Sequence, residues 1–217
     1  NQRLLAQHKF NAVAAGAAQP VYVIGVAGSV AAGKTTLARI LQSALQCLWP
    51  AKTVVCVSTD HFLYPNHAIA ERVGMQKKGF PESYRYAEMF DFVRACRMRT
   101  CKDYELPLYS HQAYDIGSTT QTLTQPDILI LEGVVALQTS SAQALPALLD
   151  TSIYLDVDQA TLRAWFLARF ESMRQDATAH DFYQKWAHLS VEEAKALALH
   201  TWQTINLVNL KQHIAPS

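Results

Sequence analysis

Residues 28–35 read Gly-Ser-Val-Ala-Ala-Gly-Lys-Thr, which has the spacing G-x-x-x-x-G-K-[ST] of a phosphate-binding loop. Such a loop surrounds a polyphosphate with backbone N–H groups, while its lysine reaches the β- and γ-phosphates and the next hydroxyl binds Mg²⁺. Glycine is needed because the backbone must turn tightly and approach the phosphates closely. The motif predicts a nucleotide site formed by Gly28, Ser29, Val30, Ala31, Ala32, Gly33, Lys34 and Thr35.

The segments on either side of the loop support this interpretation. Residues 21–27 are apolar and suit a buried parallel strand, and residues 36–45 place their apolar side chains at helical spacing. The N-terminus of that helix then points its partial positive charge at the phosphates. The alternative is a glycine-rich turn with an incidental Gly-Lys-Thr, which needs none of this context.

Two acids follow apolar runs further along the chain. Asp60 ends a predicted strand over 53–59, and Glu132 ends another over 125–131. Ligands collect at the carboxyl ends of parallel strands, so both acids are expected beside the phosphate loop. Glu132 fits an acid that acts on Mg²⁺ or its water shell, and Asp60 fits a base for an attacking hydroxyl. The alternatives are a helix cap or turn aspartate for Asp60 and a solvated loop acid for Glu132.

The composition of the chain excludes several classes of protein. The 217 residues carry 19 basic and 18 acidic side chains, so no basic excess points to nucleic acid or an anionic membrane. No apolar stretch is long enough to span a bilayer. The four cysteines lack metal-site spacing, which favours free thiols in a reducing cytoplasm over zinc ligands or disulfides. Residues 10–18 resemble a weak signal peptide but are interpreted as a short helix or linker.

Strands alternate with helices, which together with the phosphate loop predicts a P-loop α/β fold with a mostly parallel central sheet flanked by helices. We expect a single domain over 1–217, with an N-terminal helix or linker over 1–20 and an acceptor-side insertion over 61–115. A helical lid and C-terminal helix should occupy 159–214. The remaining expected elements are an extended segment over 106–114, a strand over 151–157, and helices over 88–98, 159–175 and 190–213, the last opened by a Ser190–Glu193 capping box.

Neither the N-K-x-D motif of GTPases nor the L-S-G-G helix of transport ATPases is present, which leaves small-molecule kinases or phosphotransferases. Within that class the sequence from about residue 21 to 214 resembles the bacterial type I pantothenate kinases of the phosphoribulokinase/uridine kinase superfamily. The most specific stretches are Lys-Lys-Gly-Phe-Pro-Glu-Ser-Tyr and Tyr-Ser-His-x-x-Tyr-Asp. The resemblance rests on residues 28–36, 59–66, 77–84, 109–115, 125–133, 169–170 and 205–212.

The resemblance implies phosphorylation of pantothenate by ATP with Mg²⁺, the first step of coenzyme A synthesis. It implies that Lys34 and the loop through Thr36 hold the phosphates, that Thr35 and Glu132 serve the metal, and that Asp60 activates the pantothenate hydroxyl. It also implies feedback inhibition by coenzyme A at Lys34, Arg39 and His111, and a homodimer built on a long helix. The implied substrate pocket consists of Asp60, Tyr109, His111, Phe166, Arg169 and Asn206.

Several of these residues also have a simpler interpretation. Arg39 fits an ordinary surface charge, Arg169 a snorkelling side chain, and Asn206 a polar helix face. Lys77 and Lys78 are of a type that usually faces solvent, although their loop could fold over phosphates.

The chain departs from the resembled pattern in ways that leave substrate choice and inhibition open. Phe166 replaces a tyrosine, His61 a glycine, Arg85 an acid and Met173 a phenylalanine, and the stretch 175–180 has lost its aromatic side chain. The sequence ends at Ser217, before a region that helps to hold adenine in the family, so we expect a fragment or a reduced site. Two rival functions remain: a kinase for another hydroxyl acceptor, such as a nucleoside or pantothenamide, and a non-catalytic paralogue that binds coenzyme A or nucleotide.

Overall fold

Four parallel strands form the central sheet of the computed structural model, which describes residues 7, 10–11, 20–100, 102–139, 144–176 and 181–217. The sheet order is β2-β5-β1-β6, and all three pairings are parallel. The predicted α/β fold with a parallel central sheet is therefore confirmed. The strands are β1 (Tyr22–Gly28), β2 (Val54–Ser58), β5 (Ile128–Glu132) and β6 (Thr151–Leu155).

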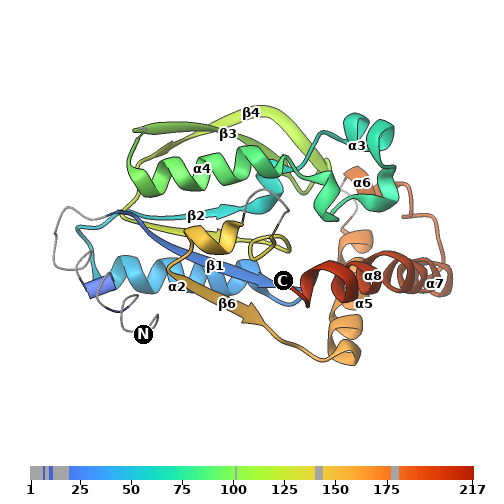
Figure 1. Cartoon of the computed structure of the whole chain (residues 1–217). Coiled ribbons are helices and arrows are strands. Elements are labelled where there is room, and N and C mark those ends of the chain that lie inside the picture. Colours follow the sequence, from blue (N-terminus) through green and yellow to red (C-terminus); the bar gives the residue numbers. More distant parts are fainter. Residues whose placement is uncertain (1–6, 8–9, 12–19, 101, 140–143, 177–180) are drawn as a thin grey trace.

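Helices α2 (Lys34–Leu48) and α4 (Tyr86–Met98) cover opposite faces of this sheet (Figure 1). Alternation along the strands decides which side chains meet which helix. Ile24 and Val26 of β1 belong to the cluster that includes Ala38 and Leu45 of α2, whereas Val23 belongs to the cluster on the α4 side. Both faces are buried, which is why the strands are continuously apolar.

An antiparallel hairpin lies beyond α4, formed by β3 (Asp103–Ser110) and β4 (Asp115–Thr124). Phe92 of α4 packs edge-on against Tyr104 of β3, with ring centroids 5.0 Å apart. The extended segment expected over 106–114 is confirmed as far as Ser110, where β3 ends. Beyond it the chain turns through Tyr114, whose φ is +55°, and returns as β4. Strand β4 escaped prediction because its exposed face is a run of threonine, serine and glutamine without apolar alternation.

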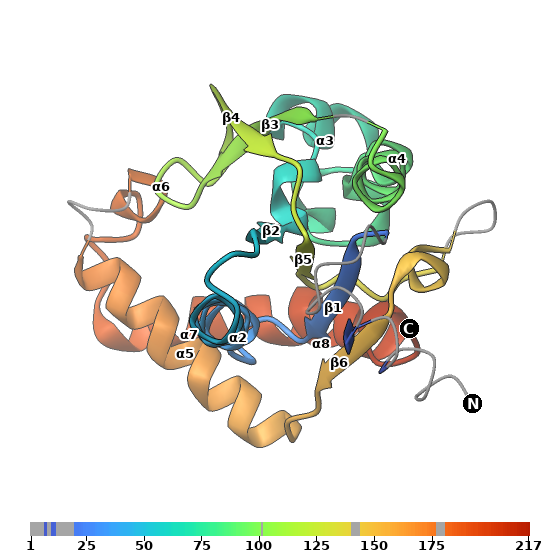
Figure 2. The same cartoon turned by 90° about the vertical axis from the view of Figure 1, so that its left-hand side faces the viewer.

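The last quarter of the chain forms helices at the carboxyl ends of the strands (Figures 1 and 2). They are α5 (Gln159–Gln175), α6 (Asp181–Gln184), α7 (Val191–Thr201) and α8 (Leu207–Asn209). The predicted capping box is confirmed, since Ser190 and Glu193 bond each other's backbone N–H. The uniform helix expected over 190–213 is corrected: it contains two π-helical stretches, Trp202–Asn206 and Leu210–Ile214.

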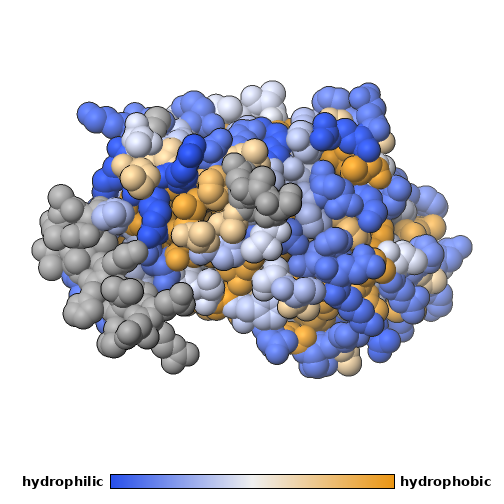
Figure 3. Space-filling view, viewed as in Figure 1, coloured by the Kyte–Doolittle hydropathy of each residue, from blue (hydrophilic) through white to orange (hydrophobic). Residues whose placement is uncertain are grey.

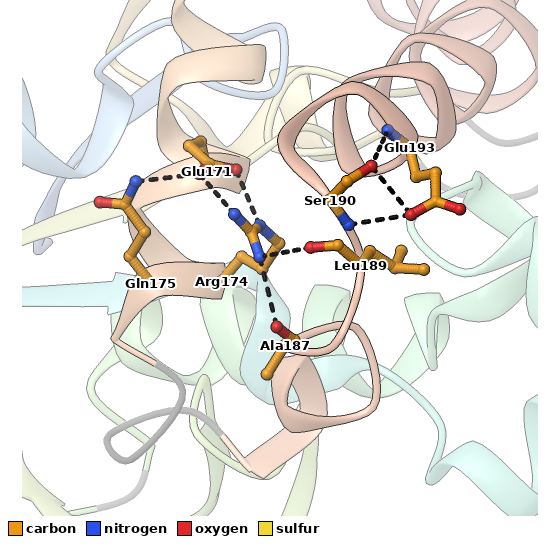
Figure 4. Close-up of polar contacts among 7 residues, drawn as sticks. All are labelled: Glu171, Arg174, Gln175, Ala187, Leu189, Ser190 and Glu193. Atoms are coloured by element: carbon orange, nitrogen blue, oxygen red, sulfur yellow. Dashed lines mark hydrogen bonds and ion pairs between the residues drawn. The ribbon is translucent and has the colours of Figure 1, made fainter.

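Arg174 ties the end of α5 to the start of α7 (Figure 4). Its guanidinium binds both carboxylate oxygens of Glu171, at 2.8 and 2.7 Å, and donates to the carbonyl oxygen of Leu189 at 3.1 Å. Because Leu189 immediately precedes the Ser190 cap, this bond connects the last turn of α5 to the start of α7.

Short helices fill the connection between β2 and the hairpin. They are α3 (Asn66–Arg72) and the 3₁₀ turns Thr59–Phe62, Met75–Lys77 and Pro81–Ser83, while a fourth 3₁₀ turn, Leu145–Leu148, precedes β6. The expectations for most of residues 1–20, for Cys101 and for 177–180 lie outside the described residues. The division into a single domain with these insertions stays a prediction.

The outer surface of the C-terminal helices is mainly hydrophilic in the view of Figure 3, with smaller apolar areas between the polar side chains. None of the helices described here is both long and apolar enough to cross a membrane.

Gly133, directly after β5, is a position where a side chain cannot fit. Its φ is +155°, and a Cβ added there would lie 1.7 Å from the hydroxyl oxygen of Thr59. We expect Gly133→Ala to lower the free energy of unfolding by about 1–3 kcal/mol, as overpacking typically does. Thermal or urea unfolding measures this loss. The control is Gly117→Ala, where the nearest atoms lie at 3.5 Å; an equal effect of both changes would contradict the explanation.

Candidate functional site

The loop between β1 and α2 has the backbone shape of an anion site. Gly33 and Ala31 both have positive φ, +88° and +66°, and α2 begins immediately after them. Within the described chain, no side chain caps the start of α2 and no acid lies in its first turn. The positive end of a 15-residue helix is therefore left for a ligand. The Ser29 hydroxyl beside it is buried and has no partner among the described residues.

Lys34, Thr35 and Glu132 meet where β1 and β5 end. The ammonium of Lys34 donates to the carbonyl oxygen of Ser29 at 2.8 Å, and the hydroxyl of Thr35 donates to Glu132 Oε1 at 3.0 Å. Burial lowers the pKa of Lys34 and raises the pKa of Glu132, and each group opposes the shift of the other. Glu132 is only 4% exposed, so it is not the solvated loop acid of the alternative interpretation.

Asp60 lies in the 3₁₀ turn that follows β2, close enough to Lys34 and Glu132 to affect the pKa of both. The buried Tyr84 donates its phenol to Asp60 Oδ1 at 3.3 Å. Burial is the main cause that raises the pKa of Tyr84 well above its usual value, and Asp60 adds to it. Tyr84 lies within the resembled Pro-Glu-Ser-Tyr stretch, yet the sequence alone gave no sign of its contact with the aspartate.

Lys78 is buried, which corrects the expectation that it faces solvent. Its ammonium donates to Asn66 Oδ1 at 2.8 Å and to the carbonyl oxygen of Tyr114, and it lies 3.7 Å from the centroid of the Tyr114 ring. Burial lowers the pKa of Lys78 to about 8, although Asp115 and Asp60 oppose the shift. Lys77, by contrast, is half-exposed and pairs with Glu82 at 3.4 Å.

Aromatic side chains of the hairpin tip surround this lysine. Tyr109 packs edge-on against His111 at 5.1 Å, and Tyr114 stacks on Phe182 of α6 at 4.1 Å between centroids. Burial is the first cause that raises the pKa of Tyr109 and of Tyr114, the latter to about 12, and Asp60 contributes to both. The hairpin tip is therefore part of the same site as Asp60.

Arg169 projects from α5 into a pocket of about 240 Å³ above the phosphate loop. Trp165, one turn earlier, lines the same pocket and is 48% exposed. The rest of the lining comes from the loop and the start of α2: Ala31, Gly33, Lys34, Thr35 and Thr36. A larger pocket of about 450 Å³ lies between Tyr86, Gln138 and Gln212 and contains none of the predicted site residues.

The structure thus places most of the predicted residues in two adjoining groups. Lys34, Thr35, Glu132 and Arg169 surround the phosphate loop, and Asp60 joins them to Tyr109 and His111 at the hairpin tip.

The described contacts do not link the other three predicted residues to these groups. Arg39 is exposed on α2 and does not line the phosphate pocket, and Phe166 packs against Trp202 at 5.7 Å. Asn206 is half-buried, and it is Asn209 that contacts the loop between β2 and α4, by donating to the carbonyl oxygen of Gly79 at 2.8 Å.

The residues present fit a magnesium ion bound together with phosphates. Among the described residues, no group of three or more histidine, cysteine or acidic side chains could hold a metal alone. Mg²⁺ with nucleotides is typically bound by one or two protein oxygens plus phosphate oxygens. The Thr35 hydroxyl and the Glu132 carboxylate, in contact at 3.0 Å, supply that kind of oxygen pair.

A parallel sheet, a phosphate loop after its first strand, an acid at the end of β5 and another in the turn after β2 define an α/β P-loop protein. More particularly, the chain belongs to the phosphoribulokinase/uridine kinase family, whose model matches residues 23–186.

Comparisons with individual proteins agree with this family. The chain is 44% identical over 211 residues to a pantothenate kinase of Rhodopseudomonas palustris (strain BisA53), covering 90% of this chain and 64% of that protein. It is 41% identical over 203 residues to a pantothenate kinase of Sorangium cellulosum (strain So ce56), covering 90% and 65%. It therefore spans less than two thirds of the length of these curated relatives.

Solved structures show the same fold at low identity. A candidate fructose transport system kinase from Silicibacter sp. TM1040 matches with a TM-score of 0.72 at 22% identity, over 97% of this chain and 92% of that one. A phosphoribulokinase from Rhodobacter spheroides matches with a TM-score of 0.53 at 13% identity, over 89% and 68%.

The buried Lys78 predicts a pH dependence of stability. Its folded pKa of about 8 lies below the ordinary value of 10.5, so the unfolded chain binds more protons between these values. Stability should therefore rise with pH above about 8, relative to a Lys78→Met variant, by roughly 1–3 kcal/mol up to pH 10. Urea unfolding of both proteins at pH 7, 8, 9 and 10 measures the difference. An unchanged difference across this range would show that the ammonium is solvated.

Proposed function

We propose that this chain carries the catalytic site of a pantothenate kinase, which transfers the γ-phosphoryl group of ATP to the hydroxyl of pantothenate. The observation that carries the proposal is the position of Asp60. Its carboxylate receives the Tyr84 phenol at 3.3 Å and lies between the phosphate loop and the aromatic hairpin tip. The identity to proteins named pantothenate kinase supports the choice of acceptor.

Asp60 acts as the general base in this proposal. It accepts the proton of the pantothenate hydroxyl as that oxygen bonds to the γ-phosphorus and the bond to the ADP oxygen breaks. Tyr84 holds one carboxylate oxygen, so the carboxylate is oriented before the acceptor arrives. A non-catalytic nucleotide-binding protein needs no such oriented base.

The phosphates are held from two directions. The loop amides and Lys34 bind them from below, and Lys34 must exchange its bond to the Ser29 carbonyl for a phosphate oxygen. Arg169, exposed on α5 and lining the same pocket, supplies the planar donor fork that suits a transferring phosphoryl group. The Thr35 hydroxyl and the Glu132 carboxylate would hold Mg²⁺, which would neutralise charge on the phosphates.

The acceptor pocket is assigned to the tip of the hairpin and the facing helices. Tyr109 at the end of β3 and His111 in the turn that follows it are assigned to this pocket. Phe166 of α5 and Asn206 of the last helix are assigned to it on the resemblance. A nucleoside remains the alternative acceptor, because Phe166 removes a hydroxyl from the resembled pocket. The intact Tyr-Ser-His stretch favours pantothenate.

Coenzyme A is proposed as a feedback inhibitor that competes with ATP, since Lys34 and His111 lie on the two sides of the site. Arg39 has the weakest support in this role because it lies outside the phosphate pocket. A homodimer in the cytoplasm completes the proposal. The long helix α2 exposes Ile40 and Leu48 (61% and 67%), which a second copy of the chain could cover.

Replacement of the base separates a kinase from a binding protein. We expect the chain to phosphorylate pantothenate with ATP and Mg²⁺, and Asp60→Asn to lower turnover by about 100-fold or more while nucleotide affinity stays within a few-fold. Phosphopantothenate formation and calorimetric ADP binding measure the two properties, with uridine and a pantothenamide as competing acceptors. Asp91→Asn, an exposed change on α4, is the control. Nucleotide binding without turnover on any acceptor would favour the non-catalytic alternative.

Removal of the buried acid tests the metal assignment. Glu132→Gln keeps an oxygen for the Thr35 hydroxyl but loses the negative charge. We expect the Mg²⁺ concentration for half-maximal activity to rise about 10-fold, since one charged ligand is lost. The exposed change Glu192→Gln on α7 serves as the control. A magnesium dependence that is the same in both variants would remove Glu132 from the metal site.

A further inference from the structure

His61, next to Asp60, joins the turn that carries the aspartate to strand β3. Its Nδ1 accepts the backbone N–H of Tyr109 at 3.1 Å. The register of the hairpin shifts between Pro107 and Tyr109, so this N–H lies at a bulge in the ladder. A bulge re-aims a strand locally, and here the imidazole satisfies the backbone donor at that point.

Arg85, at the start of α4, holds the same turn from another direction. Its Nη2 donates to the carbonyl oxygen of His61 at 2.9 Å, and its Nε donates to that of Leu63 at 3.3 Å. Its backbone N–H donates to the carbonyl oxygen of Phe62 at 2.7 Å. Glu88 fixes the guanidinium in turn, through Nη1 at 2.9 and 2.8 Å.

We infer that His61 and Arg85 form a clamp that positions the Asp60 turn against the acceptor strand of the hairpin. Both are positioning residues, since neither side chain is placed on the reacting atoms. The two residues are in direct contact, since the Arg85 guanidinium donates to the backbone carbonyl oxygen of His61. The inference rests on the proposed function only in taking Asp60 as the base.

The His61 half of the clamp needs a neutral imidazole, because a protonated Nδ1 would oppose the Tyr109 N–H with a second donor. The groups facing the imidazole are Asp60 on the same turn, the Pro107 carbonyl of β3 and His111 at the hairpin tip, while Arg85 binds the backbone behind it. Burial is the largest cause that lowers the pKa of His61. His111 adds to it, and Asp60 and Pro107 oppose it. The clamp therefore holds at neutral pH and opens as the pH falls below the ordinary histidine value of about 6.5.

Two substitutions at His61 separate the effect of its hydrogen bond to the Tyr109 N–H from the effect of its protonation. In His61→Asn the amide oxygen takes the place of Nδ1 and cannot titrate, whereas His61→Leu has no acceptor. We expect kcat on pantothenate at pH 7.5 to fall about 10- to 100-fold in His61→Leu, as for a misplaced catalytic group, and to stay within about threefold in His61→Asn. Below pH 6.5 the wild type should lose kcat more steeply than His61→Asn.

His67→Asn is the matched control, since His67 is an exposed histidine on α3, and it should keep the wild-type kcat and pH profile. A double variant, His61→Leu with Arg85→Gln, should lose less kcat than the product of the single losses, because both side chains hold one turn. Equal kcat and equal pH profiles in the wild type, His61→Leu and His61→Asn would overturn the inference.

A measurement without turnover keeps this test apart from the proposed function. Nitrogen NMR of the histidine rings should show His61 with an unprotonated Nδ1 at pH 7.5. The Tyr109 amide should exchange with solvent at least 10-fold faster in His61→Leu than in His61→Asn. If the chain did not phosphorylate pantothenate but these two results held, the inference of the clamp would stand. The proposal that pantothenate is the phosphoryl acceptor would then be wrong. A protonated Nδ1, or equal exchange in both variants, would overturn the clamp itself.

Discussion

The register of β5 between β1 and β2 is the constraint on which the rest of the site depends. Glu132 pairs with Val26 on one side and with Ser58 on the other. One row across the sheet therefore contains the buried acid and lies just before the phosphate loop and the Asp60 turn. A slip of one residue would turn Glu132 to the opposite face of the sheet, away from Thr35. Gly133 then allows the chain after β5 to pass against Thr59, which keeps the two strand ends in contact.

The two sides of the site are built on different principles. The phosphate-loop side is mainly backbone: positive φ angles, a helix N-terminus without a side-chain cap and one lysine that bonds its own loop. The hairpin side is made of side chains from distant segments, with Lys78 bonded to Asn66 and Tyr114 and with Phe182 of α6 stacked on Tyr114. A backbone site is specified by a short motif, whereas a side-chain site depends on how several loops pack together.

This difference explains how much the sequence could predict. Spacing alone located the phosphate loop, and the apolar runs that end in acids placed Asp60 and Glu132 at one sheet edge. The burial of Lys78, the Tyr84–Asp60 bond and the His61–Tyr109 bond depend on residues 24 to 48 positions apart, which no local pattern encodes. Strand β4 was missed for a similar reason, since its polar residues are held by pairing with β3 rather than by burial.

Trp165 gives the pocket at the phosphate loop a fluorescent side chain. Its indole shares the pocket wall with Arg169 and is 48% exposed, whereas Trp202 is buried and Trp49 and Trp186 pack against other aromatic rings. Indole emission shifts in wavelength when water leaves the ring, and polar groups nearby quench it. The fold therefore carries a chromophore beside the phosphate loop, so occupancy of this pocket can be followed by fluorescence without any attached label.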